Sequence, residues 1–302
     1  MGDICVSIFL LTFNQEEFIG QTIESILGQQ TDFKYQLVIG EDCSSDNTRQ
    51  ICEKYARENP NKIKLLPSEV NHGLIKNFIR TYKQCNGKYV AICDGDDYWN
   101  DPFKLQKQVD FLEANPDFGI VFTSFKLLFP DGRMFEKDYS KQAEITNFEE
   151  LILGNYICSA TAVFRNKKNI NDFPGWLDTC PYGDWPLYLW TTKKGAKIKY
   201  LDEVTAVYRR EIGVSERMKI RPISILKANC NIVAQAYRDS NFSNKKVVIK
   251  NSLLNHEFAL LASYLRAGKK RKALKYIAKL GVKKPGRLIR ILLYMGKLKI
   301  AK

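Results

Sequence analysis

Short apolar runs alternate with helical periodicities along the first 130 residues. The apolar runs, each bounded by turn-forming residues, are typical of buried strands and span 6–12, 35–40, 63–66, 89–93 and 120–129. Between them, apolar residues recur at the three- and four-residue spacing of amphipathic helices, over 15–29, 48–59, 74–85 and 102–114. This alternation predicts βαβ units and a mostly parallel α/β sheet flanked by helices.

The pattern is less regular from 137 to 213. Strands are predicted over 155–165, 196–201 and 204–208, and an aromatic-rich helix begins within 181–190. From Ile223 onward the chain is predicted to be helical, and 258–278 resembles one helix-turn-helix unit of the tetratricopeptide type. We therefore expect one α/β domain over 1–220 and a helical extension over 221–302.

Polar side chains follow three of the predicted strands. They stand at Thr12 to Asn14, at Glu41 and Asp42, and at Asp94 to Asp97. Parallel strands joined by helices end at the same edge of a sheet, and ligands bind along that edge in open α/β folds. These segments are therefore expected to meet in one cleft.

The third of these segments places Asp94, Asp96 and Asp97 within four positions. Crowded carboxylates repel one another unless something cationic neutralises them. Mg²⁺ suits this role, because it takes one or two protein carboxylates and completes its shell with water and phosphates. The alternative is a solvated acidic turn that opens a helix, with Asp101 and Pro102 as capping residues.

Charge is distributed unevenly along the chain. Residues 245–302 hold 17 of the 47 Lys and Arg but only one of the 33 acidic residues, Glu257. Residues 286–301 interleave these cations with apolar side chains, a pattern typical of a basic helix that lies on an anionic membrane. Two alternatives are a helix packed on the rest of the protein and a nucleic-acid contact; no recognition motif supports nucleic acid.

Cysteine spacing and the N-terminus suggest where the chain works. The eight cysteines are scattered without a C-x-x-C pair, which favours free thiols in a reducing compartment. Asp3 stands where a signal peptide would carry basic residues, and no apolar run approaches the roughly 20 residues of a membrane span. We expect a cytoplasmic protein, peripheral on the inner face of the membrane.

The ordered set of polar motifs resembles a known family. The motifs are Thr12-Phe13-Asn14, the run EDCSSDNT over 41–48, Asn71-His72-Gly73, Asp94-Gly95-Asp96 and Gly183-Asp184. Each motif is weak alone, but in this order they resemble the family 2 glycosyltransferases, which are inverting sugar-nucleotide enzymes of the GT-A fold. The resemblance extends from Val6 to about Ser215.

The resemblance implies a role for each motif. Glu41 or Asp42 would read the base of the nucleotide, Asp94 would contact the ribose, and Asp96 would bind the Mn²⁺ or Mg²⁺ that bridges the diphosphate. Asp184 would be the catalytic base. The expected nucleotide-sugar site as a whole comprises Thr12, Phe13, Asn14, Glu16, Glu41, Asp42, Lys76, Asp94 and Gly95.

Two positions depart from the family pattern. Lys76 stands in the stretch where the family often places an Arg that faces the base. The family's Tyr-Arg-x-His reads Tyr208-Arg209-Arg210-Glu211 here. Glu211 could ligate the metal, or the two arginines could neutralise phosphate directly.

These residues would perform glycosyl transfer from a nucleoside-diphosphate sugar, expected to be a UDP-sugar, to a saccharide or lipid-linked hydroxyl. The metal would stabilise the leaving diphosphate, and a carboxylate would accept the proton of the attacking hydroxyl. Asp184 could instead be a helix N-cap. Trp99, Trp185 and Trp190 could form a platform for sugar rings or belong to the core.

Other functions are weighed against transfer. A nucleotidyltransferase is expected to have a Gly-rich, basic loop after the first strand, and a dehydrogenase is expected to have a G-x-G-x-x-G motif there. Residues 12–16 contain neither motif. A membrane-associated nucleotide-sugar-binding protein without activity is the non-enzymatic alternative. The two histidines, His72 and His256, are too isolated for a triad or zinc cluster.

Overall fold

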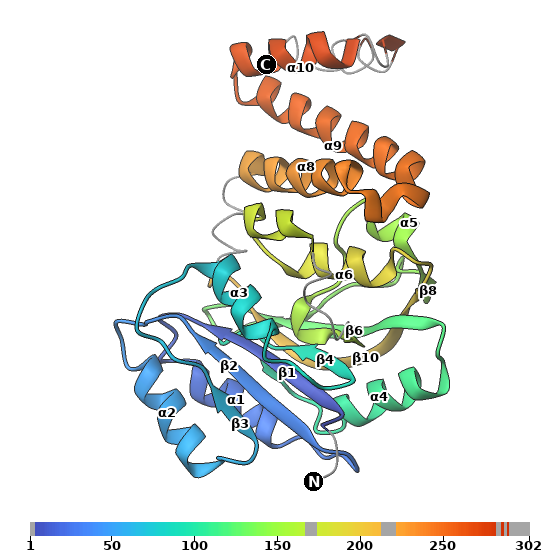
Figure 1. The fold of residues 1–302 in the computed structure, drawn as a ribbon. Coiled ribbons are helices and arrows are strands. Elements are labelled where there is room, and N and C mark those ends of the chain that lie inside the picture. Colours follow the sequence, from blue (N-terminus) through green and yellow to red (C-terminus); the bar gives the residue numbers. More distant parts are fainter. Residues whose placement is uncertain (1–3, 167–173, 213–221, 282–284, 287–288, 290–302) are drawn as a thin grey trace. The chain divides into compact units, whose positions relative to one another are not determined.

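The computed structural model describes residues 4–166, 174–212, 222–281, 285–286 and 289. The chain divides into two compact units (Figure 1). The first comprises Met1–Leu151 and Asn155–Gly213, and the second Ile152–Gly154 and Val214–Lys302. The expected boundary between 220 and 221 stays a prediction, because residues 213–221 lie outside the described part.

The first unit is built around one open sheet with helices on both faces. Its strand order is β3-β2-β1-β4-β9-β6-β10-β5, with β7 paired to β6 and β8 to β10. In chain order the elements are β1 (Val6–Thr12), α1 (Ile19–Leu27), β2 (Tyr35–Glu41), α2 (Thr48–Glu58), β3 (Ile63–Leu65), α3 (Leu74–Tyr82), β4 (Tyr89–Ile92), β5 (Tyr98–Trp99), α4 (Lys104–Ala114), β6 (Phe118–Leu128), β7 (Met134–Glu136), β8 (Ile145–Thr146), α5 (Phe148–Leu151), β9 (Val163–Arg165), α6 (Asp184–Thr192) and β10 (Lys197–Arg209).

The predicted α/β fold is confirmed, and the sheet is mixed. Strands β1, β2, β3 and β4 pair in parallel, as do β6 and β10. Strand β9 lies between β4 and β6 and is antiparallel to both, so β4 and β6 themselves run in the same direction. The ends of β1, β2, β4, β6 and β10 therefore share one edge of the sheet.

Alternation of side chains along the strands divides the core into two layers. Ile8 of β1 and Leu37 of β2 belong to a cluster with Ile23 of α1, and this cluster also takes in residues of α2 and α4. On the opposite face, Phe9 meets Phe78 of α3 with ring centroids 4.8 Å apart. Figure 1 shows α1, α2 and α4 on one side of the sheet and α3 and α6 on the other. Each fully buried aliphatic side chain contributes about 1.5–3 kcal/mol.

The helix predicted over 15–29 begins four residues later, at Ile19. The N–H of Gln15 donates to the Thr48 hydroxyl at 2.8 Å, and the N–H of Glu16 donates to Asp46 Oδ2 at 3.1 Å. These donors are satisfied by the loop before α2, so the chain stays non-helical here.

The strand predicted over 155–165 is wrong in its first two thirds. Only Val163–Arg165 forms a strand, and Ser159–Thr161 forms a 3₁₀ turn. The Ile157 N–H donates to Asn155 Oδ1 at 3.1 Å, and the Thr161 hydroxyl donates to the carbonyl of Cys158 at 2.8 Å. These local side-chain bonds replace the ladder that a strand would need.

The two strands predicted over 196–201 and 204–208 form one strand, β10. It pairs with β6 along its length, with register shifts on both sides of Val204. The exposed acidic residues Asp202 and Glu203 lie at the shift between Leu201 and Val204. A bulge of this kind lets two charged residues leave the sheet without ending the strand.

The second unit is helical. It contains α8 (Pro222–Arg238), a 3₁₀ segment (Ser240–Lys245), α9 (Lys246–Arg266) and α10 (Lys270–Gly281). The predicted helix-turn-helix is confirmed by α9 and α10, which pack through Tyr264 and Tyr276 with ring centroids 5.8 Å apart. Gly268, at φ +65°, makes the turn between them.

The structure also bears on the membrane-span, cysteine and amphipathic-segment predictions. In the part of the chain that the structure describes, each helix is too short or too polar to cross a bilayer. All eight cysteines are free thiols. Of the amphipathic segment 286–301, all but residues 286 and 289 lies outside the described residues.

Gly40, at the end of β2, is predicted to be intolerant of a side chain. A Cβ there would lie 1.9 Å from the Thr81 hydroxyl and 2.9 Å from Asn77 Oδ1, both on α3. Gly40→Ala should therefore lower the free energy of unfolding in urea by about 1–3 kcal/mol. The control is Gly175→Ala, whose Cβ would meet nothing within 4 Å and should change stability by less than about 0.5 kcal/mol. Equal stability of the two variants would contradict this packing.

Candidate functional site

The three polar segments that follow β1, β2 and β4 meet at one edge of the sheet. Thr12 lies opposite Glu41 in the β1–β2 pairing, and the Asp42 N–H donates to the Thr12 carbonyl at 3.1 Å. The Gly95 N–H donates to the carbonyl of Leu11 at 2.8 Å. The predicted convergence of these segments is confirmed.

The segment after β1 is held by the loop before α2. Asn14 has a positive φ of 51°, its N–H donates to the Ser44 hydroxyl at 2.9 Å, and its Oδ1 accepts the N–H of Ser45 at 2.9 Å. The Glu16 carboxylate accepts the backbone and side-chain N–H groups of Asn47 at 2.8 and 2.7 Å. Phe13 is left 46% exposed. The Glu16 carboxylate is thus occupied by contacts with the loop before α2, whereas the ring of Phe13 is accessible to a ligand.

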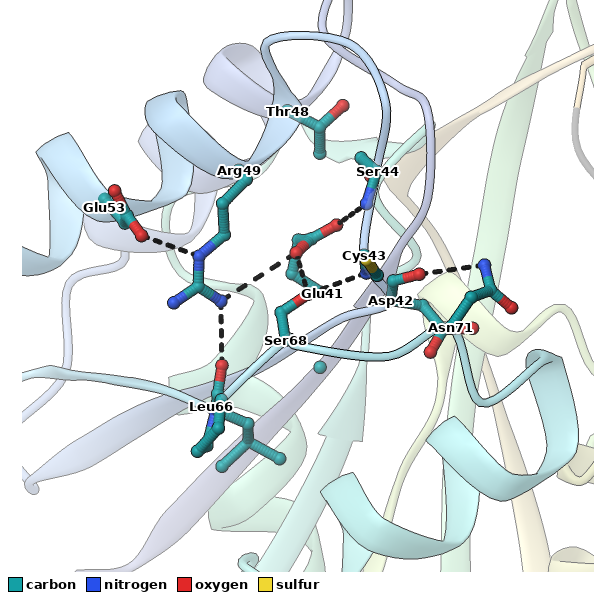
Figure 2. Close-up of polar contacts among 12 residues, drawn as sticks. Glu41, Asp42, Cys43, Ser44, Thr48, Arg49, Glu53, Leu66, Ser68 and Asn71 are labelled. Atoms are coloured by element: carbon teal, nitrogen blue, oxygen red, sulfur yellow. Dashed lines mark hydrogen bonds and ion pairs between the residues drawn. The ribbon is translucent and has the colours of Figure 1, made fainter.

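Glu41 is fully buried and its carboxylate is occupied (Figure 2). Its oxygens accept the Ser44 N–H at 2.7 Å and the Ser68 hydroxyl, and Arg49 lies 3.8 Å away. Arg49 also bonds Glu53 and the carbonyl of Leu66, as the dashed lines show. Glu41 therefore fastens the loops beside β2.

Asp42 organises the turn at 71–73. Its Oδ1 accepts the N–H of His72 at 2.8 Å, and its Oδ2 accepts that of Gly73 at 2.9 Å. Asn71 donates its side-chain amide to the Asp42 carbonyl, as Figure 2 shows. Each oxygen of Asp42 accepts one of these bonds and retains a further lone pair. Which of Asp42 and Glu41 reads a base stays a prediction.

Helix α3 supplies two cations near this turn. Lys76 is exposed. Arg80, one turn further on, donates to the carbonyls of Glu41 and Pro67, each at 2.6 Å, and to Asn77 Oδ1 at 2.8 Å. Arg80 was not predicted from the sequence. It braces the end of β2, while Lys76 keeps its ammonium available to a ligand.

The acidic turn after β4 is tightly packed. Gly95 has no room for a side chain, because a Cβ would lie 2.7 Å from the Thr12 hydroxyl. Ser159 donates its hydroxyl to Asp94 Oδ2 at 3.1 Å. Burial and the neighbouring carboxylate of Asp96 raise the pKa of Asp94 to about 7.

Asp97 lies deepest in this turn, at 1% exposed. Its Oδ1 accepts the backbone N–H of Arg209 at 3.0 Å, and its Oδ2 has no hydrogen-bond partner among the described residues. Burial, followed by the charges of Asp96 and Asp94, raises the pKa of Asp97 well above its usual range. Ionisation of Asp94 and Asp97 is therefore costly unless a cation lies close to them.

Arg209, the last residue of β10, contacts the acidic turn after β4. Its guanidinium is held between the rings of Phe18 and Tyr98, 4.7 and 5.0 Å from their centroids. It donates to the Asp96 carbonyl at 2.5 Å and to the side chain of Gln21. The structure therefore gives Arg209 a bracing role and does not support direct neutralisation of phosphate by this residue. Glu211, with φ +67°, is exposed just beyond β10.

Asp184 is the first residue of α6. Gly183 occupies the N-cap position, with no side-chain cap, so the N-cap alternative for Asp184 is wrong. Asn155 donates its amide to Asp184 Oδ2 at 2.9 Å. Burial raises the pKa of Asp184, and the N–H of Trp185 and the Asn155 amide lower it in part. The segment 155–161 contacts both Asp184 and Asp94, through the side chains of Asn155 and Ser159.

The three candidate tryptophans belong to the core. Trp99, Trp185 and Trp190 are 4%, 0% and 3% exposed. The platform interpretation is therefore wrong, and the core alternative is confirmed. A cavity of about 640 Å³ lies elsewhere in this unit, between residues 136–144 and Lys199 to Asp202. None of the predicted site residues lines it.

The donor set at the acidic turn fits a hard divalent cation. Asp94, Asp96 and Asp97 are all oxygen donors, the neighbouring carboxylates raise the pKa of Asp94 and of Asp97, and Asp97 Oδ2 has no hydrogen-bond partner among the described residues. Within the described ranges, no group of three or more His, Cys, Asp or Glu side chains is arranged around one metal position. A cation here would thus take few protein ligands, as Mg²⁺ commonly does. Glu211 as a ligand stays a prediction.

Sequence reasoning missed the polar residues that surround the predicted ones. Asn155 and Ser159 touch Asp184 and Asp94, yet they fall in a stretch predicted to be a strand. Their polar side chains, interrupting an apolar run, were the available signal. Arg80 gave no comparable signal, because the backbone carbonyls that it contacts belong to distant segments.

Comparison with known proteins identifies the family of this chain. Residues 7–171 match the family model described as Glycosyl transferase family 2. The uncharacterized protein Rv1520 of Mycobacterium tuberculosis is 32% identical over 213 residues, which are 68% of this chain and 58% of that protein. The chain thus spans somewhat more than half the length of this relative.

Further relatives cover more of their own length. The dTDP-rhamnosyl transferase RfbG of Shigella flexneri is 28% identical over 259 residues, 79% of this chain and 88% of that one. WfaP of Escherichia coli, a UDP-Glc:α-D-GlcNAc-diphosphoundecaprenol β-1,3-glucosyltransferase, is 29% identical over 234 residues, 74% and 86% of the two chains.

A solved structure supports the fold. The crystal structure of S. aureus TarS 1-349 in complex with UDP-GlcNAc superposes with a TM-score of 0.68 at 20% identity, covering 95% of this chain and 84% of that one. At this identity the likeness shows the GT-A-like fold alone. Because the family model spans more than half of its residues, the chain belongs to the glycosyl transferase family 2.

Proposed function

We propose that this chain transfers a sugar, with inversion, from a nucleoside-diphosphate sugar to a hydroxyl of a saccharide or lipid-linked acceptor in surface polysaccharide or glycolipid synthesis. One observation carries the proposal. The acidic turn after β4 and the carboxylate of Asp184 come from separate segments, and residues 155–161 contact both, Asn155 bonding Asp184 and Ser159 bonding Asp94. Transfer needs both a cation-binding group and a base, and this arrangement provides them.

The donor side lies along β1, β2 and α3. Asp42 accepts the N3–H of a pyrimidine base, Thr12, Asn14 and the exposed ring of Phe13 line the nucleoside, and Lys76 reaches it from α3. Asp94 accepts a ribose hydroxyl. UDP is the expected nucleotide, supported by the UDP-Glc donor of WfaP and the UDP-GlcNAc bound to TarS. The name of RfbG specifies dTDP, whose base carries the same N3–H.

Asp96, with Glu211 as a second candidate, would hold Mn²⁺ or Mg²⁺ beside the diphosphate. When bound, the cation supplies Lewis-acid stabilisation of the leaving diphosphate. The chain contributes the rest of the electrostatics. Arg209 donates its guanidinium to the Asp96 carbonyl and its backbone N–H to Asp97 Oδ1, and these two bonds hold the turn in place.

Asp184 would accept the proton of the acceptor hydroxyl. The hydroxyl oxygen then forms the new bond at the anomeric carbon as the bond to the diphosphate breaks. In this proposal Asp184 and Asp96, which come from separate segments, act on opposite faces of the sugar, so attack occurs on the face away from the leaving group and the anomeric configuration inverts. The Asn155 amide stabilises the ionised form that a base requires.

The helical unit supplies the proposed contact with an anionic membrane. Six exposed cations crowd the turn between α9 and α10, and no acidic partner is found for them in the described part of the chain: Arg266, Lys269, Lys270, Arg271, Lys272 and Lys275. Leu274 stands among them, 62% exposed. Mixed basic and apolar surface of this kind binds anionic lipid. The diphosphoundecaprenol acceptor of WfaP is lipid-linked, which is consistent with such a location.

Asp96→Asn should abolish metal-stimulated turnover, because the amide cannot neutralise a divalent cation. A thermal-shift screen of UDP- and dTDP-sugars would first identify the donor. Release of the nucleoside diphosphate from that donor would then be measured with and without Mn²⁺. We expect a loss of about 10²-fold or more. The control is Asp131→Asn, an exposed carboxylate that pairs with Arg133. A variant with the metal dependence of the wild type would remove Asp96 from this role.

Asp184→Asn should leave nucleotide affinity intact and lower turnover by about 10²–10⁴-fold, since it removes only the proton acceptor. Calorimetric binding of UDP with Mn²⁺ separates the two effects. Wild-type turnover in this variant would exclude Asp184 as the base. If the wild type binds UDP-sugars but neither transfers nor hydrolyses them, the protein is a binding protein and not an enzyme.

Replacing Lys269, Lys270, Arg271 and Lys272 by Gln should release the protein from vesicles that contain phosphatidylglycerol. At about 1 kcal/mol per residue near the surface, binding should weaken by about 10²–10³-fold. The control removes four exposed lysines from the sheet-containing unit: Lys34, Lys54, Lys83 and Lys141. Vesicle sedimentation measures both. An equal loss in the control would show that net charge alone, and not this turn, sets the affinity.

A further inference from the structure

One short segment touches both carboxylates that the proposed reaction uses. In residues 155–161, Asn155 donates to Asp184 Oδ2 at 2.9 Å, and Ser159 donates to Asp94 Oδ2 at 3.1 Å. The two contacts lie four residues apart on one stretch of backbone, while Asp94 and Asp184 themselves are 90 residues apart. Any shift of this segment would therefore move both contacts together.

The side chain of Asn155 is oriented by its own backbone neighbourhood. Its Oδ1 accepts the N–H of Ile157 at 3.1 Å, so the Nδ2 donor must face Asp184. An amide that donates to one carboxylate oxygen sets the plane of the carboxylate. This fixes where the other oxygen points.

The back of the segment is anchored in the core. The Trp99 indole N–H donates to the Ala160 carbonyl at 2.8 Å, and the Gln108 amide donates to the Thr161 carbonyl at 2.8 Å. Both bonds are buried. The front of the segment, which carries Asn155 and Ser159, is partly open to solvent. The segment is thus held from behind and presents its polar side chains to the site.

A buried cation completes the anchor. Lys104 is fully buried, donates to Gln108 Oε1 at 2.6 Å and lies 4.5 Å from the centroid of the Trp99 ring. Because its ammonium occupies Gln108 Oε1, the amide N–H₂ of Gln108 is directed to the segment. Lys104 therefore touches both anchoring side chains, and it is far too enclosed to bind substrate.

We infer that the segment 155–161 sets the relative position of the donor-side carboxylate, Asp94, and the acceptor-side carboxylate, Asp184. Asn155 and Ser159 are its positioning residues, and Trp99 and Gln108 anchor its backbone. The inference rests on the proposed function, because it assigns the two carboxylates to opposite sides of a transfer reaction. It explains why a run expected to be a strand folds instead into a hydrogen-bonded turn at this edge.

The two positioning residues should have separable effects. Asn155→Ala should lower kcat about tenfold and leave the KM for the donor and the Kd for UDP unchanged, because it acts through the base. Ser159→Ala should raise both the KM and the Kd about fivefold with kcat within twofold, because it acts through Asp94. Trp99→Phe, which keeps a ring but lacks the N–H, should change kcat and KM together.

Hydrogen exchange tests the anchor without any substrate. The N–H groups of Ile157, Thr161 and Ala162 bond within the segment. Trp99→Phe should speed their exchange about tenfold or more, and Gln108→Leu should do the same if Trp99→Phe fails to fold. The matched control is Asn115→Ala, whose amide bonds the Phe111 carbonyl at the end of α4 and should move neither exchange nor kinetics.

The outcomes separate this inference from the proposed function. Equal changes of kcat and KM in Asn155→Ala and Ser159→Ala, or unchanged exchange in both anchor variants, would overturn the inference while the enzyme stands. A wild-type protein that binds neither UDP nor dTDP, and releases neither of them from any UDP- or dTDP-sugar, would overturn the function instead. In that case, exchange in the anchor variants still decides whether the segment is held as inferred.

Discussion

Mutual repulsion among the carboxylates at the end of β4 is the constraint around which the site is organised. Three of them occupy four positions, and burial together with neighbouring charge makes Asp94 and Asp97 costly to ionise. The fold holds two of them with hydrogen bonds from other segments, from Ser159 to Asp94 and from the Arg209 N–H to Asp97. A bound divalent cation would balance negative charge on these carboxylates.

Rigid surroundings keep the turn from relaxing. Thr12 packs against Gly95 so closely that no side chain fits, and the guanidinium of Arg209 is clamped between Phe18 and Tyr98 behind the turn. Strain or repulsion in one loop is tolerated when packed neighbours leave it no alternative. The same logic applies to Asp42, whose carboxylate is pinned by the N–H groups of the 71–73 turn.

The order of strands and helices was predictable from hydrophobic periodicity over the first 130 residues, because each element there buries one face against a continuous sheet. Beyond that point the prediction failed wherever polar side chains bond locally. Residues 155–161 fold into a turn because Asn155 and Thr161 satisfy nearby backbone groups, and the exposed pair Asp202 and Glu203 bulges from a strand that continues past it. Periodicity carries no information about such bonds.

The sequence by itself determined which acidic residues would gather, since parallel strands end at one edge and the polar motifs follow those ends. Only the tertiary structure decided what each residue does there. It occupied Glu41 and Glu16 with loop contacts, turned Arg209 behind the acidic turn, buried the three tryptophans and brought Asn155 to Asp184. The physical reason is that a side chain's role depends on its hydrogen-bond partners, and here those partners come from segments tens of residues away.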